Sequence, residues 1–310
     1  MVEVYFKRFW FLIMGIERKR MTLKVTQREL KVLTGLEKWG ILGLGQIYGL
    51  AVETDVDIEN RVERFFNETR RRDYGRWFTK RLSGLYGLGL LQEHFFLNYR
   101  KVFTLTEAGH KKLQSLGLSS VMTLRSAVSE DYLNHELMVS AVGLVLQEIH
   151  GLAIRTERER DKSYRLGGRG PAAEKAVSDL WVAAARPKAI EVELTQKSES
   201  RYKEIWDAYR LRLPEGATVL YLTAWPSGVP CILKHAREQR AEFIFACGLR
   251  EFRNACGRST FTAFNGRTMV LAEHGERPAG LQLAGLPQTQ LRPYQLASSS
   301  FPPGEKGESL

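Results

Sequence analysis

Hydrophobic positions in the first part of the chain recur every three or four residues, which is the spacing of one face of a helix. Leu30, Leu33 and Leu36 form such a stripe, and Thr26 with Glu29 has the spacing of a capping box at a helix start. A β-hairpin is predicted after the third helix. The predicted segments are helices over 26–36, 44–52 and 74–91, a polar Arg-rich connection over 61–73, strands over 90–94 and 101–106, a polar turn over 98–100, and a helix from 107 capped by Thr106.

In the second half, short apolar runs typical of buried strands alternate with amphipathic helices. The helix predicted over 130–149 is apolar on nearly all sides, so we expect it to be largely buried. The order helix, three strands, helix, strand, helix, strand predicts an α/β domain with a mixed sheet. The other predicted segments are strands over 153–157, 176–182, 188–194, 217–223 and 243–247 and helices over 201–211 and 232–242.

Three carboxylates interrupt two of these apolar strands. Asp179 stands in one strand, while Glu191 and Glu193 stand two apart in the next and therefore share one face. An unpaired buried carboxylate costs several kcal/mol, and three together require a positive charge between them. A hard divalent cation such as Mg²⁺ meets that requirement. Lys197 and Arg201 would meet it equally well as a structural ion-pair network.

Composition and charge narrow the classes of protein to consider. The 310 residues suffice for two domains, and a formal net charge of +11 favours an acidic partner, with nucleic acid first. The three cysteines have no C-x-x-C spacing, which predicts thiols in a reducing cytoplasm without a zinc site or disulfides. The apolar run at 9–14 is too short to span a membrane, so no membrane partner is expected. We interpret residues 1–21 as an extension, with translation starting at Met1 or Met21 left open.

Three helices followed by a hairpin, with Leu105-Thr106-x-x-Gly109 after it, resemble the winged helix-turn-helix domains of bacterial DNA-binding regulators. In such domains the third helix enters the major groove, and the hairpin, or wing, contacts the backbone or the minor groove. The same charges would also fit a solvated helix face or a protein contact. The resemblance implies that double-stranded DNA is contacted by Arg76, Lys80 and Arg81 on the third helix and by Arg100 and Lys101 on the wing.

The second half resembles the restriction-endonuclease-like, or PD-(D/E)xK, nuclease fold. Asp179 matches the metal-binding Asp and Glu191 the first acid of the half-motif, so the resemblance implies Mg²⁺ or Mn²⁺ at these two residues in an active enzyme and no cofactor otherwise. Glu193 stands where a Lys is usual, and Lys197 lies one helical turn further on. The resemblance makes Asp179, Glu191, Glu193 and Lys197 the candidate catalytic residues, with Glu136 as an auxiliary acid. Ser178 replaces the usual Pro, and both departures favour a domain that has lost catalysis.

A narrower resemblance rests on the text over 190–202, Ile-Glu-Val-Glu-Leu-Thr-x-Lys-Ser-x-x-x-Tyr, and on Asn134-His135-Glu136. This text resembles the replication-relaxation family of plasmid and integrative-element proteins. It implies a cytoplasmic DNA-binding accessory protein of mobilisation, in the relaxosome, or of replication, with a relaxase or related proteins as partners. An active Mg²⁺-dependent endonuclease and a winged-helix transcriptional regulator are the alternatives. The predicted organisation is an extension (1–21), a winged helix (22–117), a linker (118–130), a restriction-endonuclease-like α/β domain (131–274) and a disordered tail (275–310).

Overall fold

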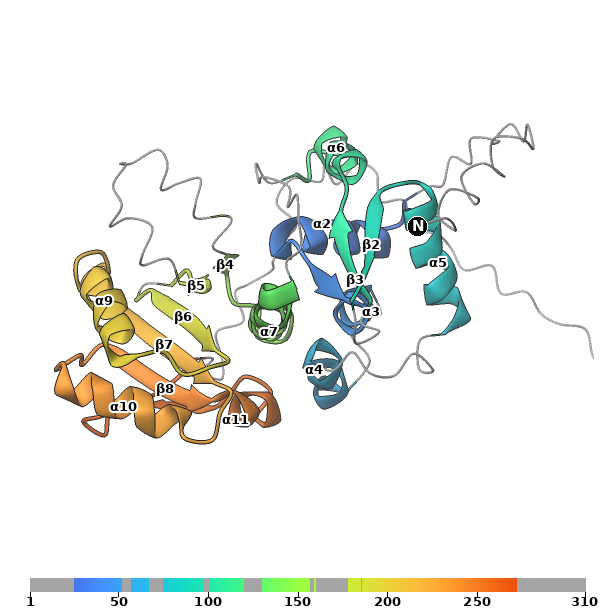
Figure 1. The fold of residues 1–310 in the computed structure, drawn as a ribbon. Helices are drawn as coiled ribbons and strands as arrows, with labels where there is room; N and C mark the ends of the chain where they lie inside the picture. Colours follow the sequence, from blue (N-terminus) through green and yellow to red (C-terminus); the bar gives the residue numbers. More distant parts are fainter. Residues whose placement is uncertain are drawn as a thin grey trace, which may run out of the picture.

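The chain forms two sheets with helices packed around them, a mixed α/β architecture of the class that the sequence predicts (Figure 1). The computed structural model describes residues 25–51, 57–66, 75–96, 101–119, 130–156, 159, 178–184 and 186–271. The predicted extension, the wing turn with Arg100, most of the predicted linker and the predicted tail lie outside the described residues. Among the described helices, none combines the length and apolar character needed to cross a bilayer.

The first sheet has three antiparallel strands in the order β1-β3-β2. Its two long strands form the predicted hairpin, in which His94 lies opposite Val102. The elements of this part are α2 (Gln27–Trp39), β1 (Leu42–Gly43), α3 (Leu44–Ala51), α4 (Ile58–Phe66), α5 (Arg76–Gly87), β2 (Leu91–Phe95), β3 (Lys101–Leu105) and α6 (Glu107–Ser115).

Both predicted helix caps are confirmed. The Thr26 hydroxyl accepts a hydrogen bond from the Glu29 backbone N–H at 3.4 Å, and the Glu29 carboxylate accepts one from the Thr26 N–H at 2.7 Å. At the start of α6, the Thr106 hydroxyl accepts a hydrogen bond from the Gly109 N–H at 3.0 Å. A Cβ atom at Gly109 would lie 2.3 Å from the Leu90 carbonyl oxygen, so this close approach of α6 to the hairpin requires glycine.

The first six residues of the stretch expected to be a polar connection, 61–66, instead belong to a helix, α4. The sequence of α4 is rich in charged residues, but Arg61, Val62 and Phe65 form a buried face on this helix. Arg61 is buried because its Nε donates a hydrogen bond to the Gly49 carbonyl at 3.2 Å, and its guanidinium lies 3.4 Å from Glu148. Because the buried face of α4 includes an arginine, the spacing of hydrophobic residues alone does not predict this helix.

The second sheet has seven strands in the order β10-β9-β8-β7-β6-β5-β4. Strands β4, β5 and β6 are antiparallel neighbours, whereas β6, β7 and β8 run parallel, which is the predicted mixed sheet. Helix α11 and strands β9 and β10 were not predicted, and α10 begins and ends four residues earlier than predicted. The elements are α7 (Glu130–Leu144), η2 (Val145–Ile149), β4 (Ile154–Thr156), β5 (Leu180–Val182), β6 (Lys188–Glu193), α9 (Glu199–Arg210), β7 (Thr218–Thr223), α10 (Gly228–Glu238), β8 (Ile244–Gly248), α11 (Leu249–Asn254), β9 (Thr260–Thr262) and β10 (Thr268–Val270).

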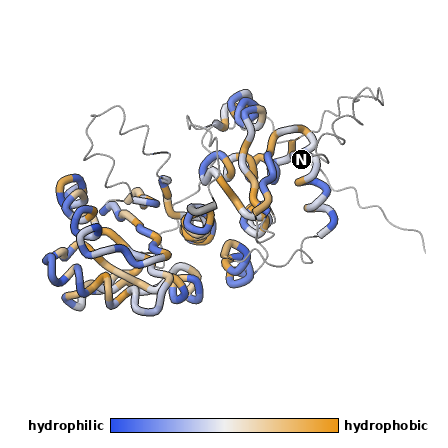
Figure 2. The backbone as a smooth tube through the Cα atoms, in the orientation of Figure 1, coloured by the Kyte–Doolittle hydropathy of each residue, from blue (hydrophilic) through white to orange (hydrophobic). Residues whose placement is uncertain are grey.

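Helix α7 lies between the two sheets and packs against both (Figure 1). It is buried as predicted, and one hydrophobic core runs from α2 and α3 through α7 to one face of the large sheet. Figure 2 shows the matching concentration of hydrophobic positions on α7 and on the strands. Lys38 adds a polar tie, because its ammonium donates to the Gln147 side-chain oxygen at 2.5 Å and to the Ile154 carbonyl at 2.7 Å. The other face of the large sheet carries a second core with α9 and α10.

Candidate functional site

The candidate acidic residues meet at the carboxyl end of β6, beside the start of β5. Leu180 pairs with Ile190, so the same register places Asp179, one residue before β5, opposite Glu191. Asp179 therefore precedes the strand that was predicted to contain it. Ile190 and Val192 pack into the core beside α7, while Glu191 and Glu193 alternate with them and belong to the face covered by α9.

Each of the three carboxylates has a donor from the protein. The Tyr209 hydroxyl on α9 donates a hydrogen bond to Glu191, and the Lys197 ammonium forms an ion pair with Glu193. Asp179 Oδ2 accepts a hydrogen bond from the backbone N–H of Val192 at 2.7 Å. Lys197 therefore forms the structural ion pair with Glu193 that was the alternative to a cation, whereas Arg201 pairs with Glu204.

His135 on α7 closes the same edge from the opposite face of the sheet. Its Nε2 lies 3.0 Å from the Val192 carbonyl oxygen and 3.4 Å from Asp179 Oδ2. Both neighbours are hydrogen-bond acceptors, so Nε2 is assigned the proton. The ring thus faces the Val192 carbonyl oxygen and a carboxylate oxygen of Asp179, one of the two residues that the nuclease resemblance assigns to a metal ion.

Burial and mutual repulsion set the charge of the cluster. Burial raises the pKa of Glu191 well above its ordinary value, and the neighbouring Asp179 raises it further against the opposing hydrogen bond from Tyr209. Burial also raises the pKa of Glu193, although the charge of Lys197 opposes the shift. The hydrogen bond with Asp179 raises the pKa of His135 despite the opposing effect of burial. Glu191 and Glu193 therefore ionise less readily than carboxyl groups in water, and a cation beside them would favour their charged forms.

The ligand atoms at this edge are oxygens, the type that a hard divalent cation prefers. Asp179 Oδ2 and the Val192 carbonyl oxygen converge on one position, the one taken by His135 Nε2, and Glu191 lies opposite Asp179 in the register. Mg²⁺ and Mn²⁺ take such carboxylate and carbonyl oxygens as ligands. Asp179 and the Val192 carbonyl, with Glu191 opposite Asp179 in the register, are the groups that could hold such an ion.

Sequence reasoning missed the contributions of His135 and Tyr209 to this cluster. Tyr209 is buried, as expected for an aromatic side chain on the covered face of a helix, but its hydroxyl reaches Glu191. The spacing of the aromatic and apolar side chains on α9 predicts which face of this helix is buried. A tyrosine on that face, near a glutamate in a strand, was the only hint in the sequence of the hydrogen bond between them. Glu136, the predicted auxiliary acid, follows His135 on α7 and is half-buried.

A second group of potential metal ligands lies between α9 and α10. Ligand atoms of Glu199, His235 and Glu238 lie within 4.8 Å of one another. His235 Nδ1 is 3.1 Å from Glu238 Oε2, an i,i+3 pair on one helix, and both glutamates are exposed. The imidazole is buried against Tyr202, with ring centroids 5.6 Å apart, so helix packing accounts for its position.

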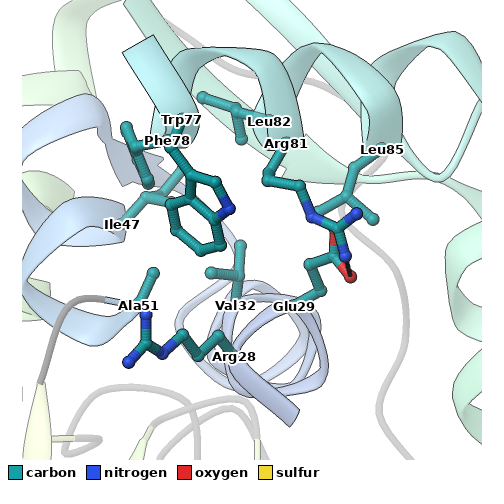
Figure 3. Close-up of a pocket in the computed structure, with 10 residues that line it drawn as sticks. All are labelled: Arg28, Glu29, Val32, Ile47, Ala51, Trp77, Phe78, Arg81, Leu82 and Leu85. Atoms are coloured by element: carbon teal, nitrogen blue, oxygen red, sulfur yellow. Dashed lines mark hydrogen bonds and ion pairs between the residues drawn. The ribbon is translucent and has the colours of Figure 1, made fainter. Parts of the chain in front are cut away.

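The candidate DNA-contacting residues of α5 fall into two environments. Arg76 and Lys80, one helical turn apart, are exposed. Arg81 instead turns toward α2, where its guanidinium makes two 2.9 Å contacts with the buried Glu29 carboxylate (Figure 3). The exposed indole of Trp77 lies on the same side of α5, with the Arg28 guanidinium 5.6 Å from its ring centroid (Figure 3).

Lys101, the described wing residue, faces a groove between α5 and the hairpin. Its ammonium pairs with Glu93 on β2 and lies 4.5 Å from the centroid of the exposed Phe95 ring. The groove has a volume of about 340 Å³ and is bordered on α5 by Thr79, Ser83 and Tyr86. Polar and aromatic side chains therefore line the junction of α5 and the wing.

Comparisons with known proteins give no relative: no family model, no curated protein and no solved structure matches the chain.

Proposed function

We propose that this protein binds double-stranded DNA through α5 and the β2–β3 hairpin. The observation that carries the proposal is the exposed pair Arg76 and Lys80 on the helix directly before the hairpin. Exposed arginine and lysine on one helix face suit phosphate contacts, and exposed Trp77 and Tyr86 supply amphipathic surface beside them. A chain carrying a formal net charge of +11 is attracted to DNA over a long range.

The order of elements supports a winged helix as the binding unit. The series α2, β1, α3, α5, β2, β3 with a sheet ordered β1-β3-β2 is the arrangement expected for that class, and α4 is an additional helix between α3 and α5. On this proposal α5 enters the major groove and the hairpin contacts the backbone. Arg81 contributes by fixing α5 on α2 rather than by reaching for DNA.

The proposed cellular role is that of a cytoplasmic accessory protein of a plasmid or integrative element, acting in mobilisation or replication with a relaxase or related protein. It rests on the resemblance of residues 190–202 to the replication-relaxation family. The order α7, β4, β5, β6, α9, β7, with β6 parallel to β7, is compatible with the nuclease-like domain that this resemblance implies.

Salt-dependent duplex binding tests the primary proposal. Fluorescence anisotropy with a labelled duplex should show a dissociation constant that rises linearly with salt on a double-logarithmic plot, because binding releases counterions. Absence of duplex binding at low salt would refute the proposal.

The acidic edge favours a second function, a metal-dependent endonuclease. Asp179, Glu191 and the Val192 carbonyl would hold Mg²⁺ or Mn²⁺, which when bound supplies an acidified water and offsets charge on the scissile phosphate. Tyr209 orients the Glu191 carboxylate, and Lys197 holds a positive charge beside Glu193 that would offset charge building on a bound phosphate.

Nicking of supercoiled DNA with Mg²⁺ or Mn²⁺ tests this second function. Asp179→Ala and Glu191→Ala should each abolish the nicking while leaving duplex binding by α5 unchanged. Failure of the wild-type protein to cut supercoiled, linear or single-stranded DNA with either metal would remove the endonuclease and leave the DNA-binding proposal standing.

A further inference from the structure

The edge of β6 beyond the start of β5 is closed by two side chains instead of a strand. The backbone N–H and C=O of Val192 both point to the side on which β5 has not yet begun. Asp179 accepts the N–H, and His135 donates to the carbonyl. On the side away from β7, these two side chains, among the described residues, satisfy the backbone groups of Val192.

The His135 ring takes the position at which a cation would satisfy the same oxygens. Its Nε2 faces both the Val192 carbonyl at 3.0 Å and Asp179 Oδ2 at 3.4 Å. With two acceptors in front of it, Nε2 carries a hydrogen and has no lone pair to offer a metal. A metal ion that took this position would have to break both of these contacts and displace the N–H from between the two oxygens.

The other groups of the cluster do not take this position. Lys197 is engaged with Glu193, and Tyr209 with Glu191, both on the α9 face of the sheet. His135 comes from α7 on the opposite face, where its side chain is 37% exposed. The partial exposure leaves room for the ring to swing outward, whereas a fully packed ring would be fixed.

We propose that His135 is a plug: its imidazole and a hard divalent cation exclude each other at the Asp179–Val192 edge. This inference rests on the second proposed function, the metal site, and is independent of DNA binding. It makes His135 a positioning residue that determines how readily the site takes up Mg²⁺ or Mn²⁺. In the metal-free protein the imidazole stabilises this edge through its contacts with the Val192 carbonyl and Asp179.

Calorimetric titration of the full chain with Mn²⁺ tests the plug. His135→Ala should bind Mn²⁺ about tenfold tighter or more than the wild type, because the ion no longer breaks a charge-assisted hydrogen bond to enter. His135→Gln, whose amide can still donate to the Val192 carbonyl, should stay near the wild-type affinity. Adding Asp179→Asn to His135→Ala should remove the gain.

Two controls separate the plug from simpler effects. Lys197→Gln removes a positive charge beside the cluster but leaves the ring in place, so it measures the purely electrostatic gain, which His135→Ala must exceed. Circular dichroism and duplex binding by the same preparations show that each variant is folded.

Three results would overturn the inference, and they are distinguishable. An unchanged or weaker Mn²⁺ affinity in His135→Ala, with wild-type binding that depends on Asp179, removes the plug and keeps the metal site. A gain that survives Asp179→Asn places the ion elsewhere. No Mn²⁺ binding by either the wild type or His135→Ala removes the metal site together with the plug, while duplex binding still reports on the primary function.

Discussion

The Nε2 atom of His135 lies 3.0 Å from the carbonyl oxygen of Val192, which connects α7 to the open edge of β6. The same helix packs against α4 and β1 on its other side. One helix thus contacts both the part of the chain that carries the candidate DNA-binding surface and the acidic edge of the large sheet. Changes that disturb the packing of α7 against the DNA-binding part of the chain are therefore expected to affect both.

Gly143 on α7 tests this packing most simply. A Cβ at this position would lie 2.2 Å from Cη2 of the buried Trp39 ring on α2. Gly143→Ala should lower the free energy of unfolding by about 1–3 kcal/mol through overpacking, in spite of the better helix propensity of alanine. Urea denaturation followed by circular dichroism measures the change.

Gly87→Ala is the matched control, because Gly87 ends α5 and a Cβ there would meet nothing within 4 Å. It should be neutral or stabilising by up to about 1 kcal/mol. Equal stability of Gly143→Ala and the wild type would mean that α2 does not press on α7 at this point.

Substitutions of Arg81 and Arg76 are expected to change the stability of the fold by very different amounts, although both arginines lie on α5. Arg81→Ala leaves the Glu29 carboxylate, which is only 4% exposed, without its guanidinium partner and should cost about 1–3 kcal/mol of stability. Arg76→Ala changes an exposed side chain and should alter stability by less than about 0.5 kcal/mol. Chemical denaturation of the two variants measures the free energy of unfolding of each. A similar loss of stability in both variants would contradict the ion pair between Arg81 and Glu29.

His150 should make the fold sensitive to acid. Burial lowers the pKa of His150, whose Nε2 donates to the Cys256 carbonyl at 2.6 Å. The unfolded chain binds a proton near pH 6.5, but the folded chain does so only at lower pH. The stabilisation is therefore fully present above pH 6.5 and is lost as the pH falls through the folded-state pKa.

His150→Gln keeps a donor for Cys256 and does not titrate, so its stability should fall less between pH 7 and pH 5. All other residues are the same in both proteins, so the difference between the two pH profiles isolates His150. Parallel profiles would show that His150 is charged as easily in the folded chain as in the unfolded one.

Most helices and strands could be predicted because local signals agree with the packing. Thr26 and Glu29 begin α2 through a capping box that needs no tertiary partner, and the apolar run over 217–223 becomes the buried strand β7. Helix α4 was missed because Arg61 counts as polar in any periodicity, yet its guanidinium is satisfied by Gly49 and Glu148 from other elements. The burial of Arg61 on α4 therefore depends on tertiary contacts that the local sequence does not encode.

The candidate site was predictable in its acids but not in their partners. The two-residue spacing of Glu191 and Glu193 fixes their common face, whereas the partner of each carboxylate depends on which helix covers that face. His135 reaches the cluster only because α7 crosses the other side of the sheet at Val192. The division between Arg76 and Arg81 likewise follows from the position of α2, which no spacing on α5 encodes.

Duplex affinity of the double variant Arg76→Ala/Lys80→Ala tests the central claim most directly. Anisotropy titrations against a labelled duplex at several salt concentrations should show affinity lower by about tenfold or more and a salt slope smaller by about 2, one for each lost phosphate contact. Arg237→Ala/Arg250→Ala removes two exposed charges from α10 and α11 and should bind like the wild type. Equal affinity and slope for both double variants and the wild type would contradict DNA binding through α5.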